Sequence, residues 1–182
     1  EQLEPLVASA AAVGDAGVEA ATAAAARAFA EQGRVLEVVA ACRRPDVPAL
    51  QRVLAGCGAA IGEAQDLGYK HRAVMNHCKA VAEALQGLSW VAYTGPGCGL
   101  PVPAAHVEEA WNSGEFWANK VLRERKAAEG GAAHVEWCRR LKALFLALKA
   151  YCKEHHPAGP AWDPQGADAA AFQPGGGAGS GG

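Results

Sequence analysis

Apolar side chains recur at alternating intervals of four and three residues in three separate segments. The three sets are Leu50, Leu54, Cys57, Ile61 and Ala64; Val74, Cys78, Val81, Leu85 and Leu88; and Trp137, Leu141, Leu144, Leu148 and Tyr151. An α-helix turns once every 3.6 residues, so this spacing gathers each set on one helix face, whereas a half-buried strand needs strict alternation. Each stripe is typical of a helix in an antiparallel bundle.

Three further helices are predicted where the pattern is less regular. A short helix spans about 3–13, and a long helix spans about 15–42, with Asp15 as a candidate N-cap. A third, which follows Pro103, has apolar residues on two faces and is therefore expected to lie centrally. Alanine, the best helix former, accounts for 43 of the 182 residues and favours helix where large apolar residues are sparse.

Proline and glycine mark the ends of these helices. Pro45 and Pro48 flank Asp46, which can cap a helix that begins there, and further breaks fall at 68–70, 95–103 and 130–131. We therefore predict an all-α, six-helix antiparallel bundle over residues 1–156. From residue 157 on, Pro, Gly and Ala dominate, so 157–182 is predicted to be a flexible Pro/Gly-rich linker that leads to further domains. The side chains of Trp90, Trp111, Phe116, Trp137 and Leu144 are assigned to the core.

Charge and cysteine usage narrow the class of protein. The net charge of −2 argues against a nucleic-acid binder, which needs concentrated Lys and Arg to release counterions. No run approaches the 18 apolar residues of a membrane span, and the first residues lack the basic start of a secretory signal. The six cysteines fall mostly on helical patterns, so free thiols in a reducing, cytoplasmic compartment are favoured over disulfides.

Motifs for catalysis or metal binding are weak. The chain has no C-x-x-C and no G-x-S-x-G, and the loop at 95–99 lacks the Lys-Ser/Thr that completes a phosphate loop. A nucleophilic Cys98 in that loop has no neighbour that would obviously activate it. His77 and His106 are expected to hydrogen-bond neighbouring backbone. We therefore expect no enzyme activity, no cofactor and no metal.

Surface recognition is the remaining class of function. Lys120 and Arg123 share a helix face, and Arg139, Arg140 and Lys142 open the next helix, so these cations could form a basic ledge. A solvated face of mixed charge explains the same spacing equally well. Two aromatic residues are further contact candidates: Tyr93 beside the Gly/Pro loop, and Trp162, which could instead fold back over the bundle.

Several motifs, in order, resemble the N-terminal helical domain of the cyclase-associated proteins. Residues 76–92, NHCKAVAEALQGLSWVA, follow the family run N-H-x-x-A-V-x-E-x-x-x-x-L-x-W-V-A, and 116–126, FWANKVLRERK, are similar to F-Y-x-N-R-V-L-K-E-Y-K. HVEEAWN at 106–112, HVEW at 134–137, KAYCKEH at 149–155 and GPAW at 159–162 continue the resemblance, and CRRP at 42–45 matches a C-x-x-P break. The resemblance covers about residues 14–165 and is most specific between 76 and 162.

The resemblance implies a non-catalytic regulator of actin dynamics. It implies binding to actin and to cofilin-decorated filaments, promotion of depolymerisation at pointed ends, and monomer recycling in the cytoplasm, at the actin cytoskeleton or cell cortex. It also implies an upstream oligomerising segment that binds adenylyl cyclase in fungi, and homodimerisation. The actin- or cofilin-binding residues hypothesised from the matched motif and expected exposure are Asn119, Lys120, Arg123, Lys126, Tyr93, Gly95 and Pro96. The alternative is a passive scaffold or dimerisation module, including one linked to adenylyl cyclase signalling.

Overall fold

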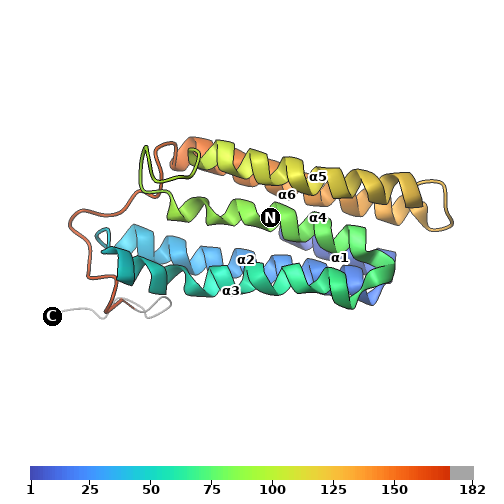
Figure 1. The fold of residues 1–182 in the computed structure, drawn as a ribbon, viewed down its shortest axis with the longest axis horizontal. Helices are drawn as coiled ribbons and strands as arrows, with labels where there is room; N and C mark the ends of the chain where they lie inside the picture. Colours follow the sequence, from blue (N-terminus) through green and yellow to red (C-terminus); the bar gives the residue numbers. More distant parts are fainter. Residues whose placement is uncertain (173–182) are drawn as a thin grey trace.

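The computed structural model describes residues 1–172, and its regular elements are helices (Figure 1). The α-helices are α1 (Leu3–Val13), α2 (Ala16–Ala41), α3 (Val47–Lys70), α4 (Met75–Leu85), α5 (Pro103–Arg125) and α6 (Gly131–His155). Two 3-10 helices, Arg72–Val74 and Gln86–Ala92, flank α4. The predicted all-α class with six helices is confirmed. None of the helices in residues 1–172 is both long and apolar enough to cross a lipid bilayer.

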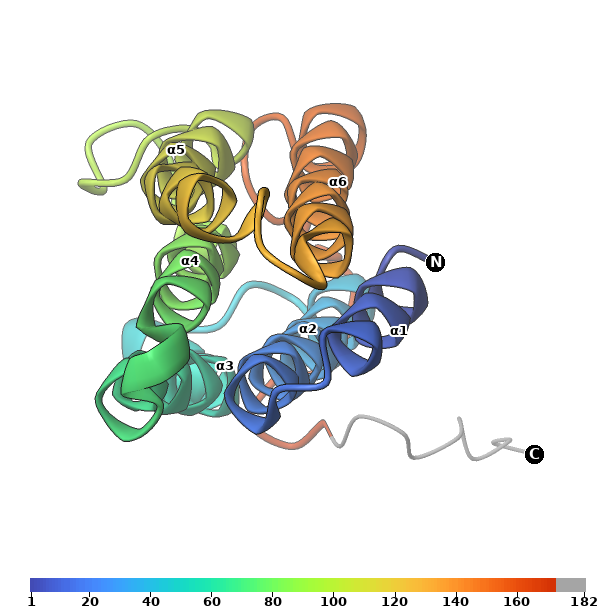
Figure 2. The ribbon, with the colours of Figure 1, turned by 90° about the vertical axis from the view of Figure 1, so that its right-hand side faces the viewer.

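The six helices form a closed ring when viewed along the bundle (Figure 2). Each helix packs beside its neighbour in the chain, and α1 packs against α6, which closes the ring. Short connections make successive helices antiparallel, as expected for neighbours in a bundle. The core lies inside this ring.

Local signals in the sequence set the helix ends. The Asp15 carboxylate accepts hydrogen bonds from the backbone N–H groups of Gly17 and Val18 at the start of α2, and Asp46 accepts one from Ala49 at the start of α3. These caps satisfy backbone donors that have no partner within the helix. Gly14, with φ of 70°, closes α1 in the left-handed conformation that favours glycine.

Four of the five predicted core side chains are buried, and one is not. Trp90 and Trp137 are fully buried, and Trp111 and Leu144 are nearly so. The assignment of Phe116 to the core is wrong, because its side chain is 55% exposed. Consecutive positions on a helix point about 100° apart, and the neighbouring Trp117 takes the inward position and packs against the core.

Residues 157–172 follow α6 without forming a helix and pack against the junction of α2 and α3. The backbone N–H of Ala167 donates to the Ala41 carbonyl over 2.9 Å, and that of Arg43 donates to the Ala167 carbonyl over 3.0 Å. Trp162 was predicted either to contact a partner or to fold back over the bundle. In the structure it packs against the bundle. The predicted boundary at residue 157 stays a prediction, and the part of the predicted linker at 173–182 lies outside the described residues.

Candidate protein-interaction surface

The last two turns of α5 and its C-cap residue, Lys126, present four of the residues predicted to bind a partner. Asn119, Arg123 and Lys126 are exposed, and Lys120 is half-buried. Residues three or four apart lie on the same side of a helix, so Asn119, Arg123 and Lys126 form one row there. Phe116 and Lys120, four residues apart, lie beside this row, and Lys120 and Arg123 line a hollow that α4 borders.

Lys120 is held against two aromatic rings. Its Nζ lies 4.6 Å from the ring centroid of Phe116 and 4.0 Å from that of Trp117. From α4, Lys79 places its Nζ 4.3 Å from the Trp117 centroid. The two aromatic rings meet edge to face, 5.3 Å apart. A cation over an aromatic face is attracted by the ring's negative centre, so both ammonium groups are positioned on the surface.

Helix α4 forms the other side of this surface. Met75 and Asn76 line an open hollow together with Trp117, Lys120, Arg123 and Glu124. Asn76 Nδ2 donates a 2.8 Å hydrogen bond to Glu124 Oε1, which ties α4 to the end of α5. Nearby, Arg125 Nη2 donates to the carbonyl oxygen of Ala73 over 3.1 Å. The side chains around the hollow are therefore held by contacts between the two helices.

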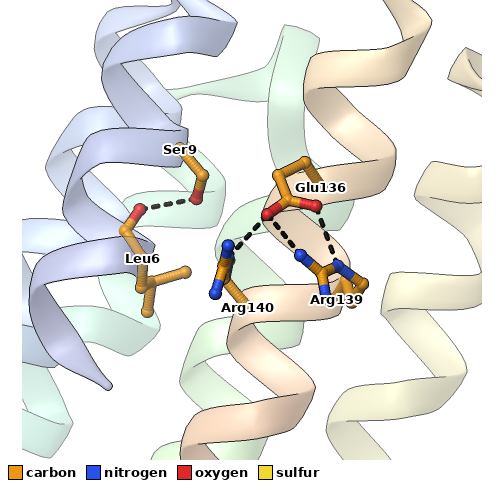
Figure 3. Close-up of polar contacts among 5 residues, drawn as sticks. All are labelled: Leu6, Ser9, Glu136, Arg139 and Arg140. Atoms are coloured by element: carbon orange, nitrogen blue, oxygen red, sulfur yellow. Dashed lines mark hydrogen bonds and ion pairs between the residues drawn. The ribbon is translucent and has the colours of Figure 1, made fainter. Parts of the chain in front are cut away.

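The basic residues that open α6 are engaged with carboxylates instead. Figure 3 shows Glu136 accepting hydrogen bonds from Arg139, at 2.7 and 2.8 Å, and from Arg140, at 2.6 Å. The hydrogen bonds from Arg139 and Arg140 lower the pKa of Glu136 to about 2. Lys142 Nζ lies 2.6 Å from Glu115 Oε1 on α5. Arg139, Arg140 and Lys142 are therefore paired with carboxylates, and they do not form the unpaired basic ledge that the sequence suggested.

The predicted loop residues lie elsewhere. Tyr93 was expected to be exposed, but it is buried, and Gly159 approaches so closely that a Cβ there would lie 2.8 Å from a Tyr93 ring carbon. Gly95 is half-buried and Pro96 is exposed. The loop precedes α5, whereas Asn119 to Lys126 lie at its far end, about 24 Å along the helix from Pro103 (Figure 1). The structure therefore does not bring the two predicted groups together.

Buried His77 on α4 contacts half-buried His134 on α6. His77 Nε2 and His134 Nδ1 are 2.9 Å apart, so His77 contacts a side chain on α6 rather than neighbouring backbone. Burial, with His134 beside it, lowers the pKa of His77 to about 4. His106 does contact backbone, with Nε2 3.1 Å from the Gln86 carbonyl oxygen. Neutral His77 therefore serves as a packing element between α4 and α6.

Sequence reasoning missed the α4 side of the surface and its aromatic centre. Asn76 and Lys79 were noted within the family run 76–92, but neither they nor Met75 were predicted to bind a partner, because their own segment gives no sign of which helix packs beside it. The i, i+4 spacing of Phe116 and Lys120 was an available signal, since aromatic and cationic side chains at that spacing meet on a helix surface. Within residues 1–172, no group of three or more His, Cys, Asp or Glu side chains is arranged to hold a metal ion.

Comparisons with known proteins agree in sequence and in fold. The family described as CAP, N-terminal domain, matches residues 1–159. Cyclase-associated protein 1 of Arabidopsis thaliana is 39% identical over 155 residues, which are 80% of this chain and 31% of that protein. Adenylyl cyclase-associated protein 1 of Homo sapiens is 34% identical over 136 residues, 73% of this chain and 27% of that protein. The chain thus spans less than a third of these relatives.

Two solved structures share the fold. One is the N-terminal domain of the adenylyl cyclase-associated protein (CAP) from Dictyostelium discoideum, with a TM-score of 0.82, 23% identity and 93% of both chains covered. The other, an N-terminal domain of CAP described as indicating variable oligomerisation, has a TM-score of 0.82 and 24% identity, covering 93% of this chain and 88% of its own. At these identities the likeness extends to the fold alone.

Proposed function

The chain belongs to the CAP N-terminal domain family, and from this membership we propose that it is an actin-binding regulator of actin dynamics. It works with cofilin to promote filament depolymerisation at pointed ends and the recycling of monomers. The setting is the cytoplasm, at the actin cytoskeleton or cell cortex. The bundle of residues 1–156 acts as the binding domain.

The surface at the end of α5 is the observation that supports this proposal. Lys120 and Arg123 have no carboxylate within 4.0 Å among the described residues, in contrast to Arg139, Arg140 and Lys142. Unpaired cations attract an acidic partner and raise the rate of encounter. The exposed Phe116 side chain beside them supplies apolar contact area, and buried aromatic side chains contribute much of the binding energy at protein interfaces.

The proposed mechanism is differential binding rather than catalysis. A ligand shifts a conformational equilibrium only by as much as its affinities for the two states differ. The domain would bind a terminal actin subunit more tightly in the conformation that leaves than in the filament conformation. No covalent step is required, so the domain acts without a catalytic residue, cofactor or metal.

Contacts are proposed at Asn119, Lys120, Arg123 and Lys126 and, at the other end of α5, at the loop residues Tyr93, Gly95 and Pro96. Because the two groups lie at opposite ends of the helix, a partner that touches both must cover the length of the bundle. Tyr93 would act from beneath the loop by positioning it, since its side chain is buried.

Imaging of single actin filaments that carry cofilin tests the proposal. The wild-type chain should raise the rate of subunit loss at pointed ends, and Lys120→Ala/Arg123→Ala should remove most of that increase. Arg139→Ala/Lys142→Ala is the matched control, because it also removes two positive charges but from paired positions. A double variant at 120 and 123 that depolymerises filaments as fast as wild type would contradict the proposed site.

A second candidate function is a non-catalytic scaffold or dimerisation module, including one linked to adenylyl cyclase signalling. The variable oligomerisation described for a neighbour of the same fold is the observation that favours it. Such a module would form homodimers and leave pointed-end kinetics unchanged. The same imaging experiment, together with sedimentation of the chain, separates the two functions.

A further inference from the structure

Trp117 has an apolar neighbour on each side where α4 and α5 pack together: its ring meets that of Phe116, and it lines the open hollow with Met75. Phe116 is 55% exposed and Met75 37% exposed, while Trp117 packs against the core with one part of its ring system and lines the open hollow with another. We call Met75, Phe116 and Trp117 the aromatic patch. Burying such side chains stabilises a complex, because apolar area leaves water, and the thioether of a methionine adapts to irregular shapes.

Three cations surround the aromatic patch. Lys79 and Lys120 lie over the Trp117 ring, and Arg123 lines the hollow beside them. Within residues 1–172 none of the three has a carboxylate within 4.0 Å. Glu124, the one carboxylate that lines the hollow, has an oxygen engaged by Asn76. The centre is therefore apolar, and three cations against the one carboxylate of Glu124 leave its surroundings with a net positive charge.

The two lysines are held in place before any partner arrives. A lysine normally loses side-chain entropy when it is fixed in an interface, and that loss weakens binding. Here the Trp117 ring already holds both ammonium groups within 4.3 Å of its centroid. A carboxylate approaching the patch thus meets donors that need little further ordering.

We propose that the aromatic patch is the anchor of the partner-binding surface and that it takes an apolar side chain flanked by carboxylates, presented by an acidic protein segment. The apolar side chain packs on Phe116, Trp117 and Met75, and the carboxylates pair with Lys79, Lys120 and Arg123. The surface is thereby centred on the junction of α4 and α5, away from the loop at 94–102. Only the identity of the partner rests on the proposed function; the chemistry of the anchor does not.

The first experiment uses Phe116→Ala and Lys79→Glu in the full 182-residue chain, with binding measured by cosedimentation with cofilin-bearing actin filaments. Phe116→Ala should weaken binding by about tenfold, and Lys79→Glu by a similar factor that diminishes at high salt. Leu146→Ala is the matched control, because Leu146 is 48% exposed on α6, outside the patch, and it should change binding by less than about twofold. Unchanged melting temperatures establish that the variants fold.

If wild type binds filaments and Phe116→Ala binds as well as Leu146→Ala does, the anchor is wrong while the proposed function stands. If wild type does not bind filaments, the proposed function fails, and a peptide-binding experiment then tests whether the aromatic patch is an anchor. The probe is the acetylated, amidated peptide Asp-Glu-Leu-Glu-Asp, titrated into ¹⁵N-labelled chain and followed by NMR. It should shift the indole N–H signal of Trp117 and the side-chain amide of Asn76, and a peptide with Ser in place of Leu should bind at least about fivefold more weakly.

Equal binding of the Leu and Ser peptides would show a site that reads charge alone and would overturn the anchor. Shifts confined to the loop at 94–102, or no shift at millimolar peptide, would overturn it as well. In each of these outcomes, the binding of the wild-type chain to cofilin-bearing filaments tests the proposed function independently of the peptide result.

Discussion

Trp137 is fully buried on α6, and its indole N–H donates a 2.9 Å hydrogen bond to the hydroxyl oxygen of Thr22 on α2. The Thr22 side chain is itself buried, so no water can replace it without rearrangement. This bond crosses the bundle and fixes the orientation of a large core side chain. Removing only the acceptor would leave a buried donor unsatisfied, which costs more than losing both partners.

We predict that Thr22→Val lowers the free energy of unfolding by about 1–3 kcal/mol, because the variant keeps the shape of the side chain but removes the acceptor. Urea denaturation followed by circular dichroism measures the change. Thr22→Ser, which keeps the hydroxyl and loses one methyl group, should cost only about 1 kcal/mol. A Thr22→Val variant as stable as wild type would show that the hydrogen bond contributes nothing.

His77 makes the stability of the domain depend on pH. In the unfolded chain its pKa is near 6.5, while in the folded domain burial lowers the pKa to about 4. Between these values the unfolded state holds a proton that the folded state does not, so the free energy of unfolding falls as pH drops from 6.5 toward 4 and levels off below. Among the groups that act on His77, His134 and Arg125 lower its pKa and Asp15 raises it.

The expected loss of stability from this histidine between pH 7 and pH 5 is about 2 kcal/mol, measured by urea denaturation at both pH values. His77→Gln removes the titrating group and should flatten the pH dependence, whereas His155→Gln, a change at an exposed histidine, should leave it as in wild type. If His77→Gln loses as much stability as wild type over this range, other groups cause the pH dependence.

Phe116 shows where prediction from sequence stops at this scale. The predicted helix after Pro103 carries an apolar stripe at Val107, Ala110, Gly114, Trp117 and Val121, and this stripe is the inward face of α5. Phe116 was assigned to the core although its position lies off that stripe. Its exposure follows from the helix period. Its pairing with Lys120 and Trp117 depends in addition on how α4 packs, which the sequence of α5 does not contain.

At the scale of elements, α4 and α5 approach closely because of Gly114. A Cβ built there would lie 2.8 Å from the Ala80 carbonyl oxygen and 2.9 Å from the Ala84 Cβ. Gly62 in the middle of α3, in contrast, has nothing within 4 Å of the same position. Alanine favours helix over glycine by about 1 kcal/mol, so only packing can make the same substitution unfavourable.

We therefore predict opposite signs for one chemical change. Gly114→Ala should destabilise the domain by about 1–3 kcal/mol, since backbone must move to admit the methyl group. Gly62→Ala should stabilise it by about 0.5–1 kcal/mol through helix propensity. Thermal unfolding of both variants beside wild type measures the pair, and a stabilised Gly114→Ala variant would show that α4 and α5 adjust without cost.

Helix ends were predictable where one side chain supplies the cap, as Asp15 and Asp46 do. The end of the fourth predicted helix was not, because the segment Gln86–Ala92 is 3-10. Its apolar residues, Leu88 among them, continue the stripe of α4, and over two turns a period of 3.0 cannot be told from 3.6 by spacing. The predicted helix therefore has the right position, but its last part is a 3-10 helix instead of an α-helix.

At the scale of the molecule, the segment 157–172 links the end of α6 to the junction of α2 and α3. Its composition indicates a linker, but composition does not report backbone hydrogen bonds, which any sequence can form. The bonds between Ala167 and the backbone of Ala41 and Arg43 are of this kind. An ion pair between Arg43 and Asp168, at 2.9 Å, lies beside them.

Cys42 reports whether this segment stays in place. Its side chain is fully buried in a small cluster with Val38 and Ala169, against which Trp162 packs. A chain that ends at His156 lacks two of those neighbours, so the Cys42 thiol should react with a disulfide reagent such as DTNB about tenfold faster or more, because thiol reactivity depends on access. The measurement needs the Cys98→Ser background, since Cys98 is exposed and would react first.

A chain that ends at Phe172 is the matched control and should protect Cys42 as the full chain does. Equal protection in both truncated chains would mean that α2 and α3 cover Cys42 unaided, and that residues 157–172 are not part of the folded unit.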